Sequence, residues 1–359
     1  MSAAVSHTPA PEAVIVAGGF GTRLRPLTTR RPKHLLEVGG VPFLEHQIAR
    51  LAAAGVAHVV LATSYRADLF RPVLGDGDRW GIRLDFVQEE EPLGTAGAIR
   101  NVAGALGDDP EAPVVILNGD ILSGHDLHAQ LADFARPREG RRVDVSLHLV
   151  TVADARPFGC VPTDEHGRVT GFLEKSEHPV TDQINAGCYV FRRAVVDRIP
   201  PGRVVSVERE TFPELVARGA LVVGYVESAY WRDVGTPQAL VAASRDLVLG
   251  VADSPALRAP AGPRDALIAD SARVDAGAEV AAGSVVGEGA VVGRARVTGS
   301  VVMPGARVDD GASVLDSALG PGARVGQGAV LREVTLGDDA VVPAGAQLCG
   351  VRIECGETA

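Results

Sequence analysis

Residues 13–35, AVIVAGGFGTRLRPLTTRRPKHL, place a short apolar run directly before a glycine-rich loop. The run Ala13–Ala17 is a candidate buried strand. Gly18, Gly19 and Gly21 carry no side chain that would keep an anionic ligand away from the backbone N–H groups. The loop lacks the Gly-Lys-Ser/Thr of a P-loop and the third glycine of a GxGxxG motif. A strand that ends in such a loop predicts a phosphate-binding site of another kind.

Lysine is rare in this chain, since only Lys33 and Lys175 among the 35 basic residues are lysines. The planar fork of arginine does not replace a compact ammonium group at a crowded phosphate. Chance retention on the surface is the alternative for each lysine, and a glycine turn without a ligand is the alternative for the loop. Arg23 and Lys33 add positive charge on either side of the glycines, which favours phosphate binding.

Downstream of this loop, short apolar runs alternate with helical patterns up to residue 245. The apolar residues of Pro42–Ala54 recur at helical spacing, and His58–Ala62 follows as a strand. Further strands are predicted at Ile82–Val87, Val114–Leu117 and Val143–Val150, and helices near Thr95–Leu106 and Asp126–Ala135. This alternation predicts a mainly parallel, Rossmann-like sheet with ligands at the carboxyl ends of its strands. A smaller extra layer or lid is expected from strands near Gly159–Val161, Val169–Glu174 and Cys188–Phe191.

A different period begins at residue 266. Small residues flank a series of valines six positions apart, namely Val274, Val280, Val286 and Val292. After an interruption near Arg296–Gly305 the pattern resumes. A hexapeptide period is typical of a parallel β-helix, in which the valine fills the prism and glycine or alanine turns the corners. A glycine-rich β region without this order is the alternative, and the number of hexads in register argues against it.

The segment between these patterns, Asp246–Arg264, contains three prolines and is interpreted as a linker. We therefore expect an α/β domain over residues 12–245, a linker over 246–265 and a left-handed β-helix of hexapeptide repeats over 266–355. A chain of 359 residues is long enough for two such domains.

Composition excludes several classes of protein. The net charge of −10 argues against broad binding to nucleic acid, which needs a basic face. The apolar runs fall short of the roughly 20 residues of a membrane span, and residues 1–12 lack the features of a signal peptide. The four cysteines form no CxxC pair, which argues against a zinc ribbon and a disulfide scaffold. We expect a cytoplasmic protein with no membrane partner.

Two aspartates are candidates for holding a metal ion. Asp120 follows the strand VVIL, and Asp233 lies in the segment WRDVGTP. Two carboxylates distant in sequence can share one Mg²⁺ that also binds substrate phosphates, although each aspartate can equally cap a turn. Gln88 could read a base edge and Gly94 could let a base pack closely. The acidic run Glu89–Glu91 is expected to be solvated.

The segments GFLEK and NAG supply candidates for a sugar phosphate. Glu174 and Asn185 can hydrogen-bond sugar hydroxyls, and Lys175 can meet a phosphate. An exposed charge pair is the alternative for Glu174 and Lys175. Covalent catalysis is not expected, because Ser, His and Asp show no recognisable arrangement. Phosphoryl-type chemistry needs positioning and charge neutralisation instead.

In this order, AGGFGTRLRPLT, RPKHL, LNGD, FLEK, INAGCYVF and WRDVGTP resemble the sugar-1-phosphate nucleotidyltransferase family. The stretch EEEPLGTAG and the added hexapeptide domain resemble the mannose-1-phosphate guanylyltransferases, and FGCVPTDE and VSVERETFPEL are similar to their actinobacterial members. The likeness covers about residues 12–355 and implies that residues 12–245 form the catalytic domain. It implies that mannose 1-phosphate attacks the α-phosphate of GTP directly and in line, with Mg²⁺, to give GDP-mannose and pyrophosphate.

The resemblance also implies roles for single residues. Those that would bind the nucleotide are Ala17, Gly18, Gly19, Gly21, Thr22, Arg23, Lys33, Gln88, Gly94 and Thr95. Those that would bind the sugar phosphate are Gly159, Glu174, Lys175 and Asn185. Asp120 and Asp233 would bind Mg²⁺, and the catalytic set would be Arg23, Lys33, Asp120, Lys175 and Asp233. The chain departs from the family pattern at Phe20, where a polar or basic residue is usual, and at His34, where proline is usual.

Other functions stay open at this point. The same chemistry could join a heptose 1-phosphate to GTP, or glucose 1-phosphate to UTP or dTTP. A non-catalytic regulatory homologue is a further alternative, which the retained charged residues disfavour. An acyltransferase β-helix is excluded because it uses a histidine as general base, and all histidines lie at or before His178. The open edges of a β-helix favour packing against another subunit, so a homo-oligomer is expected.

Overall fold

The computed structural model describes residues 10–64, 66–173, 175–257 and 265–359. Contacts between residues divide the chain into two compact units. The first contains the chain up to Gly18 together with Leu51–Ile121 and His125–Trp231. The second contains Gly19–Arg50, Leu122–Gly124 and Arg232–Ala359. The segment that follows Gly18 therefore groups with the C-terminal repeats and not with the strand that precedes it.

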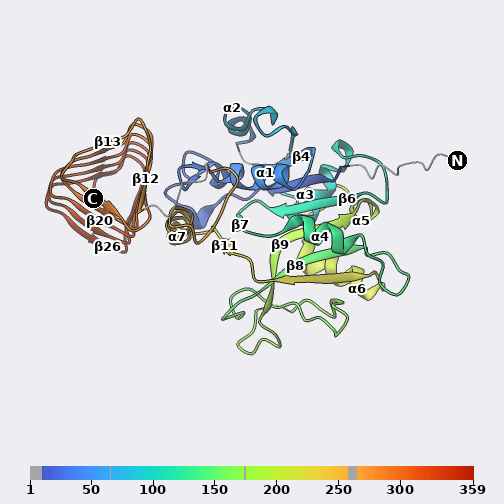
Figure 1. Ribbon diagram of the computed structural model, residues 1–359. Coiled ribbons are helices and arrows are strands. Elements are labelled where there is room, and N and C mark those ends of the chain that lie inside the picture. Colours follow the sequence, from blue (N-terminus) through green and yellow to red (C-terminus); the bar gives the residue numbers. More distant parts are fainter. Residues whose placement is uncertain (1–9, 65, 174, 258–264) are drawn as a thin grey trace. The chain divides into compact units, whose positions relative to one another are not determined.

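The first unit is built on a seven-stranded sheet in the order β10-β8-β9-β6-β1-β4-β5 (Figure 1). Its strands are β1 Glu12–Ala17, β4 His58–Thr63, β5 Arg83–Gln88, β6 Pro113–Asn118, β8 Val145–Thr151, β9 Gln183–Arg192 and β10 Val222–Glu227. Strand β1 lies between β4 and β6 and is parallel to both. Ala13, Val14 and Ile15 are fully buried, which explains the continuous apolar run that begins the sequence pattern.

Seven α-helices connect the described strands. They are α1 Phe43–Ala53, α2 Phe70–Leu74, α3 Gly94–Asn101, α4 Leu127–Phe134, α5 Arg193–Arg198, α6 Phe212–Ala217 and α7 Pro237–Val248. Shorter helices are η1 Thr22–Leu24, η2 Lys33–Leu35, η3 Ala67–Leu69, η4 Asp78–Trp80, η5 Ala103–Ala105 and the π-helix η6 Val207–Thr211. Side-chain caps fix two of the starts, since Asp126 accepts from the Ala129 amide and Thr236 from the Ala239 amide.

The prediction that Cys188–Phe191 belongs to a lid is wrong. This segment is part of β9, which lies inside the main sheet and runs antiparallel to both β6 and β8. Tyr189 and Phe191 are fully buried because both faces of the sheet are covered here. The other two predicted lid strands are reduced to isolated bridges, Cys160 with Leu173 and Thr163 with Val169.

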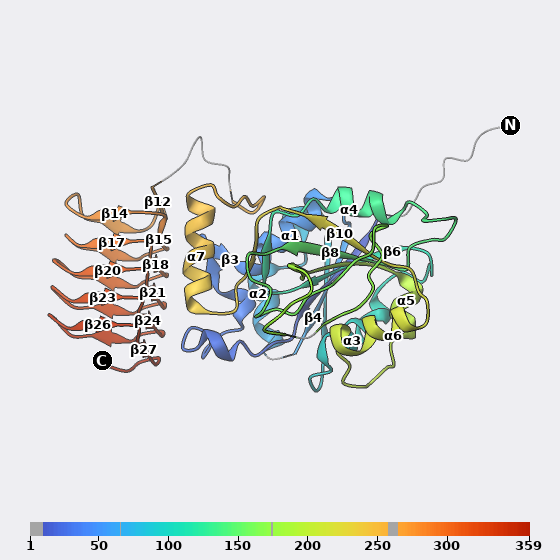
Figure 2. The same cartoon turned by 90° about the horizontal axis from the view of Figure 1, so that it is seen from below.

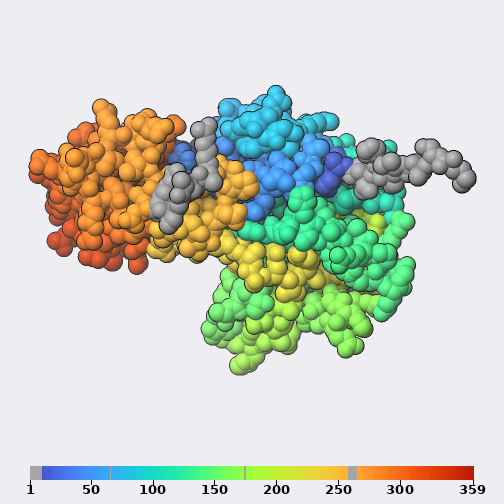
Figure 3. Space-filling model, viewed as in Figure 1, coloured from blue at the N-terminus to red at the C-terminus, as the bar shows by residue number. Residues whose placement is uncertain are grey.

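The second unit contains a left-handed parallel β-helix, whose strands stack in regular tiers (Figure 2). One face consists of β12 Ala266–Ile268, β15 Ser284–Val286, β18 Val301–Val302, β21 Ala318–Leu319, β24 Thr335–Leu336 and β27 Arg352–Ile353. The second consists of β13 Arg273–Val274, β16 Val291–Val292, β19 Arg307–Val308, β22 Arg324–Val325 and β25 Val341–Val342. The third consists of β14 Glu279–Ala281, β17 Arg296–Thr298, β20 Ser313–Leu315, β23 Val330–Arg332 and β26 Gln347–Cys349. Side chains cover the prism on the face that Figure 3 shows.

The interruption of the hexapeptide pattern has a simple structural cause. Successive buried residues in the prism are Val297, Val302, Val308, Val314, Leu319, Val325, Leu331, Leu336 and Val342. The first coil is eighteen residues long, since Ala266 pairs with Ser284, and the second is sixteen, since Val285 pairs with Val301. The second coil has two successive intervals of five residues, from Val292 to Val297 and from Val297 to Val302, which break the period of six. From Val302 onward each coil has one interval of five residues and two of six. The helix itself is continuous, and Val301 pairs with Ala318 as Ala318 pairs with Thr335.

Buried serines satisfy the backbone at the shortened corner. The amide of Ser300 donates to Ser284 Oγ at 3.2 Å, and the amide of Ser317 donates to Ser300 Oγ at 3.0 Å. The amide of Val334 donates to Ser317 Oγ at 3.0 Å. Each hydroxyl thus replaces the hydrogen bond that a full-length corner would make, and no buried amide at these positions is left without an acceptor.

Two two-stranded sheets complete the described strands. Strand β2, Glu37–Val38, pairs with β3, Val41–Pro42, and β7, Ile121–Ser123, pairs with β11, Trp231–Asp233. Helix α7 continues to Val248, three residues into the predicted linker, and Asp246, Leu247 and Val248 are buried there. Asp246 also pairs with Arg232 at 2.6 Å. Residues 258–264 of that linker lie outside the described part. No helix of the described residues has both the length and the hydropathy that crossing a membrane requires.

A cluster of histidines and one glutamate is buried in the first unit. The rings of His125 and His148 are stacked with centroids 3.9 Å apart. A ring nitrogen of each histidine lies within ion-pair distance of the same carboxylate oxygen of Glu227. Burial alone would lower the pKa of His125, but Cys188 and the Glu227 carboxylate raise that pKa to about 10. Burial alone would raise the pKa of Glu227, but the two histidines lower it to about 2. An ionised His125–Glu227 pair therefore stabilises this end of β8 and β10.

The substitution Glu227→Gln tests this pair. It should cost about 2 kcal/mol of unfolding free energy near pH 6, the size of a lost hydrogen bond to a charged group. The contribution of His125 is complete below its ordinary pKa of 6.5 and is lost as the pH rises toward 10. The contribution of Glu227 is complete above its ordinary pKa of 4.5 and is lost as the pH falls toward 2.

The gap in melting temperature between the wild type and Glu227→Gln should therefore be widest between pH 5 and pH 6.5 and should narrow by pH 10, as followed by circular dichroism. Glu165→Gln, at an exposed glutamate of the same unit, is the control and should change little. A gap that is the same at every pH would contradict an ionised pair.

Candidate nucleotide and sugar-phosphate site

Predicted site residues follow the carboxyl ends of neighbouring strands in the first unit. Val16 of β1 pairs with Asn118 of β6, so Gly18 and Asp120 each follow two residues later at the same edge. The Gly119 amide donates to the Val16 carbonyl at 2.9 Å, which holds the two strand ends together. Ala17 ends β1 and Gln88 ends β5 at this edge. Ligands of parallel sheets lie at this edge.

Glu89 also lies at this edge, and the prediction that it is solvated is wrong. Its exposed fraction is 5%, and burial raises the pKa of its carboxyl group, against a hydrogen bond from the Leu93 backbone. A Cβ atom on Gly18 would lie 3.3 Å from Glu89 Oε2. Glu89 Oε1 is buried without a hydrogen-bond partner among the described residues. The three consecutive glutamates concealed that the first of them points inward, directly after β5.

The rest of the glycine loop belongs to the second unit and folds around Lys33. Gly21 has a φ of +63°, and a Cβ atom there would lie 2.9 Å from Lys33 Cβ. A Cβ atom on Gly19 would lie 3.3 Å from Lys33 Cε. Thr28 Oγ1 donates to the Gly21 carbonyl at 2.8 Å. The lysine thus packs across both glycines, with Thr22 at the start of η1 directly after Gly21.

Arg23 and Asp233 are neighbours in the second unit. Arg23 Nη2 lies 3.7 Å from Asp233 Oδ2, and the side chains are 65% and 31% exposed. A Cβ atom on Gly235 would overlap with Arg23 Nη2, so a side chain in this position of WRDVGTP would displace the Arg23 guanidinium. Asp120, the other predicted metal ligand, belongs to the first unit. Both aspartates offer hard carboxylate oxygens of the kind that Mg²⁺ takes.

A cavity of about 680 Å³ in the first unit brings five predicted residues together. They are Gly94, Thr95, Gly159, Lys175 and Asn185. The first two were predicted to bind the nucleotide and the other three the sugar phosphate. The cavity is also lined by Phe158, Glu208 and Arg209, which the sequence analysis did not select. Glu174, the remaining predicted sugar-phosphate residue, lies outside the described residues.

Asn185 is held in one orientation. Its Nδ2 donates to the Tyr189 hydroxyl at 2.8 Å and to Glu208 Oε1 at 2.9 Å. Its Oδ1 accepts from the Gly187 amide at 3.0 Å. Glu208 therefore takes part in positioning a predicted binding residue. Its segment, VSVERETFPEL, indicates the family likeness but does not single out Glu208 within it.

The start of helix α3 is attached to the segment that carries Glu208. The Val207 amide donates to Thr95 Oγ1 at 2.9 Å. Gly94 has a φ of +71°, and a Cβ atom on it would lie 2.7 Å from the Val205 carbonyl. Gly94 and Thr95 therefore attach the start of α3 to residues 205–207 in the cavity wall, and glycine is required at position 94.

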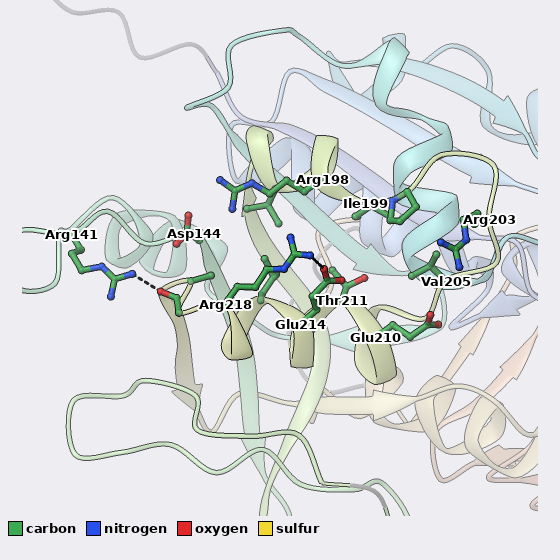
Figure 4. A pocket seen from close by; sticks show the side chains of 15 residues that line it. Arg141, Asp144, Arg198, Ile199, Arg203, Val205, Glu210, Thr211, Glu214 and Arg218 are labelled. Atoms are coloured by element: carbon green, nitrogen blue, oxygen red, sulfur yellow. Dashed lines mark hydrogen bonds and ion pairs between the residues drawn. The ribbon is translucent and has the colours of Figure 1, made fainter.

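A second cavity of the first unit, about 490 Å³, contains several arginines (Figure 4). Its arginines are partly engaged by the protein itself, since Arg218 pairs with Glu214 at 2.6 Å and Arg141 donates to the Gly219 carbonyl at 2.6 Å. The residues that line it include none of the predicted site residues. The candidate site is therefore the larger cavity together with the strand ends.

Comparison with known proteins identifies the family of each domain. Residues 12–248 match the family described as nucleotidyl transferase, and residues 267–354 match the GlmU-like C-terminal hexapeptide family. The chain belongs to the nucleotidyl transferase family. It is an enzyme with a hexapeptide-repeat β-helix at its C-terminal side.

Three relatives illustrate the likeness. A mannose-1-phosphate guanylyltransferase of Mycobacterium tuberculosis is 56% identical over 268 residues, which are 74% of this chain and 72% of that protein. A mannose-1-phosphate guanyltransferase of Aspergillus fumigatus is 39% identical over 63% of this chain and 61% of that protein, less than two thirds of its length. The crystal structure of HddC from Yersinia pseudotuberculosis complexed with GMP-PN is 27% identical with a TM-score of 0.55, over 65% and 97% of the two chains.

The substitution Gly21→Ala tests the packing of the loop. Alanine meets both an unfavourable φ and Lys33, so it should weaken the binding of a nucleoside triphosphate by about tenfold or more. Gly55→Ala is the matched control, because Gly55 has a φ of +80° and open space around its Cβ position. Calorimetric titration should show weak binding for the first variant and ordinary binding for the second. Equal losses in both would mean that backbone strain alone is responsible.

Proposed function

We propose that this nucleotidyltransferase is a mannose-1-phosphate guanylyltransferase, which forms GDP-mannose and pyrophosphate from mannose 1-phosphate and GTP. The observation that carries the proposal is the larger cavity, in which Gly94 and Thr95 share a wall with Lys175 and Asn185. A nucleotide region and a cation for a second phosphate in one cavity are what direct transfer requires. The 56% identity to the mycobacterial enzyme supports the choice of substrates.

The reaction needs no covalent intermediate. An oxygen of the sugar phosphate attacks the α-phosphorus in line, and the bond from that phosphorus to the departing pyrophosphate breaks. Lys175 neutralises the attacking phosphate. Arg23 and Lys33 stabilise the negative charge that develops on the leaving β- and γ-phosphates. Positioning and charge neutralisation are the main contributions of a protein to such transfers.

Asp120 and Asp233 would hold Mg²⁺ in this scheme. Their carboxylate oxygens suit this ion, which keeps its remaining positions for phosphate oxygens and water. When bound, the ion neutralises phosphate charge in the same way as the lysine and arginine side chains. The contact of Arg23 with Asp233 places one of the two carboxylates beside the cationic loop.

Glu89 supports guanine as the base. Guanine has two adjacent donors, N1–H and N2–H₂, that a single carboxylate can accept. Glu89 offers a buried carboxylate next to Gly18, and one of its oxygens has no hydrogen-bond partner among the described residues. A base without this pair of donors would leave that oxygen unsatisfied, which is a strong basis for selection.

The proposed activity is tested by measuring pyrophosphate release with Mg²⁺ and mannose 1-phosphate. GTP, ATP, UTP and dTTP are supplied in separate reactions, and Asp120→Asn is the control that should be nearly inactive. A strong preference for GTP is expected. Release with glucose 1-phosphate or a heptose 1-phosphate, and none with mannose 1-phosphate, would keep the chemistry and change the substrate. No release with any sugar phosphate would overturn the proposal.

Lys175→Met tests whether Lys175 binds the sugar phosphate and not GTP. Removing the cation that meets the sugar phosphate should raise the KM for mannose 1-phosphate at least tenfold, while the Kd for GTP stays within about twofold. Lys175→Arg should recover only part of the loss, because a planar fork does not replace an ammonium group. Steady-state kinetics with each substrate varied in turn give the answer. A loss confined to GTP would place Lys175 at the other substrate.

The setting of the enzyme is part of the same proposal. Its four cysteines are free, as expected in a reducing compartment, and we place it in the cytoplasm. The short strands of the β-helix end in open edges that favour association, so the active form is proposed to be a homo-oligomer.

A further inference from the structure

The end of the β-helix reaches back to the cationic loop within the second unit. Five side-chain hydrogen bonds join residues 338–355 of the last coils to residues 23–31 of the loop. The two segments are more than 300 positions apart in sequence. The loop carries Arg23, which the proposed function places on the leaving phosphates.

Arg352 supports the backbone at Arg23 itself. Arg352 Nη1 donates to the carbonyl oxygens of Arg23 at 2.9 Å and of Arg25 at 3.0 Å. These carbonyls lie at the end of the short helix η1, where a helix leaves its last acceptors without internal partners. Because the Arg23 side chain is mostly exposed, its position is set chiefly by the backbone that Arg352 holds.

Asp338 provides the more deeply buried contact. Its side chain is only 5% exposed, and its Oδ2 lies 2.5 Å from Arg31 Nη2. Next to it, Asp339 pairs with Arg30 at 2.5 Å, although both of these side chains are exposed. Removing Asp338 would leave the Arg31 guanidinium without its partner in a partly buried position, which is costly.

Cys355 adds a weaker contact at the centre of the loop. Its Sγ donates to the Pro26 carbonyl at 3.6 Å. With Leu24 and Leu27 buried at 1% exposure, the loop is anchored by its apolar side chains on one side and by the β-helix at its carbonyls and arginines. The end of the β-helix therefore touches the loop at residues 23, 25, 26, 30 and 31.

We propose that residues 338–355 form a clamp that positions the nucleotide-binding loop, with Arg352 and Asp338 as positioning residues for Arg23. The β-helix then contributes to triphosphate binding without touching the substrate. This inference rests on the proposed function of the loop. It assigns the last coils a role in catalysis that oligomer formation alone would not require.

The test is the double variant Asp338→Ala/Arg352→Ala in the full chain. It should lower kcat/KM for GTP by about tenfold or more, the effect of losing one or two hydrogen bonds to charged groups. The KM for mannose 1-phosphate should stay within about twofold. Arg307→Ala/Asp309→Ala is the matched control, because it removes one basic and one acidic side chain that pair with each other within the β-helix. The single variant Arg352→Lys, with Asp338 unchanged, should keep more activity than the single variant Arg352→Ala.

Hydrogen–deuterium exchange provides a readout that does not depend on turnover. The amides of residues 22–29 should exchange faster in the clamp variant and unchanged in the control, while the coils before residue 330 keep their protection in both. Equal kinetics and equal exchange in the wild type and the clamp variant would overturn the proposal. A fall in kcat with both KM values unchanged, in proportion to a loss of folded protein, would also overturn it.

Failure of the proposed function gives a different pattern. The wild type would then release no pyrophosphate with any nucleotide, and the kinetic assay would detect no activity for any variant. Hydrogen–deuterium exchange would still test the clamp. Faster exchange at residues 22–29 of the clamp variant supports the clamp, and unchanged exchange contradicts it.

Discussion

The packing of Lys33 across Gly19 and Gly21 is the contact on which the rest of the site depends. It keeps the two glycines close to the lysine, and a side chain at Gly21 would collide with Lys33. The path of this loop determines where Arg23 lies and therefore whether it can approach Asp233. The same path presents the carbonyls of Arg23 and Arg25 to Arg352. One glycine–lysine contact thus helps to determine where the charged groups of the loop lie.

Local sequence was sufficient where one residue type and its immediate neighbours decide the structure. The run Ala13–Ala17 is buried on both faces of the sheet and shows it by being apolar at every position. Lys33 was selected because the chain has almost no other lysine, and it is found against the glycines. The inward valines were recognised by their period, although corners one residue shorter interrupt it from Val292 onward.

Local sequence failed where pairing over long distances decides the structure. Strand β9 resembles any short apolar strand, and only its pairing with β6 and β8 places it inside the main sheet. Glu89 is one of three consecutive glutamates, and nothing in their order tells which is buried. Glu208 becomes visible as a site residue only through its contact with Asn185. The roles of these side chains in turnover remain predictions that the sequence and the geometry jointly support.

The contacts that the last coils make with residues 23–31 also set the length of the β-helix. Each coil adds one strand spacing, about 4.8 Å, along the axis. Insertion of a whole coil would keep every valine in the prism and every serine in its ladder, but it would move Arg352 and Asp338 one spacing away from the loop that they contact. The number of coils is therefore constrained by these contacts. Repeat proteins ordinarily tolerate the gain or loss of a repeat, but in this chain such a change would break contacts with a loop near the opposite end of the sequence.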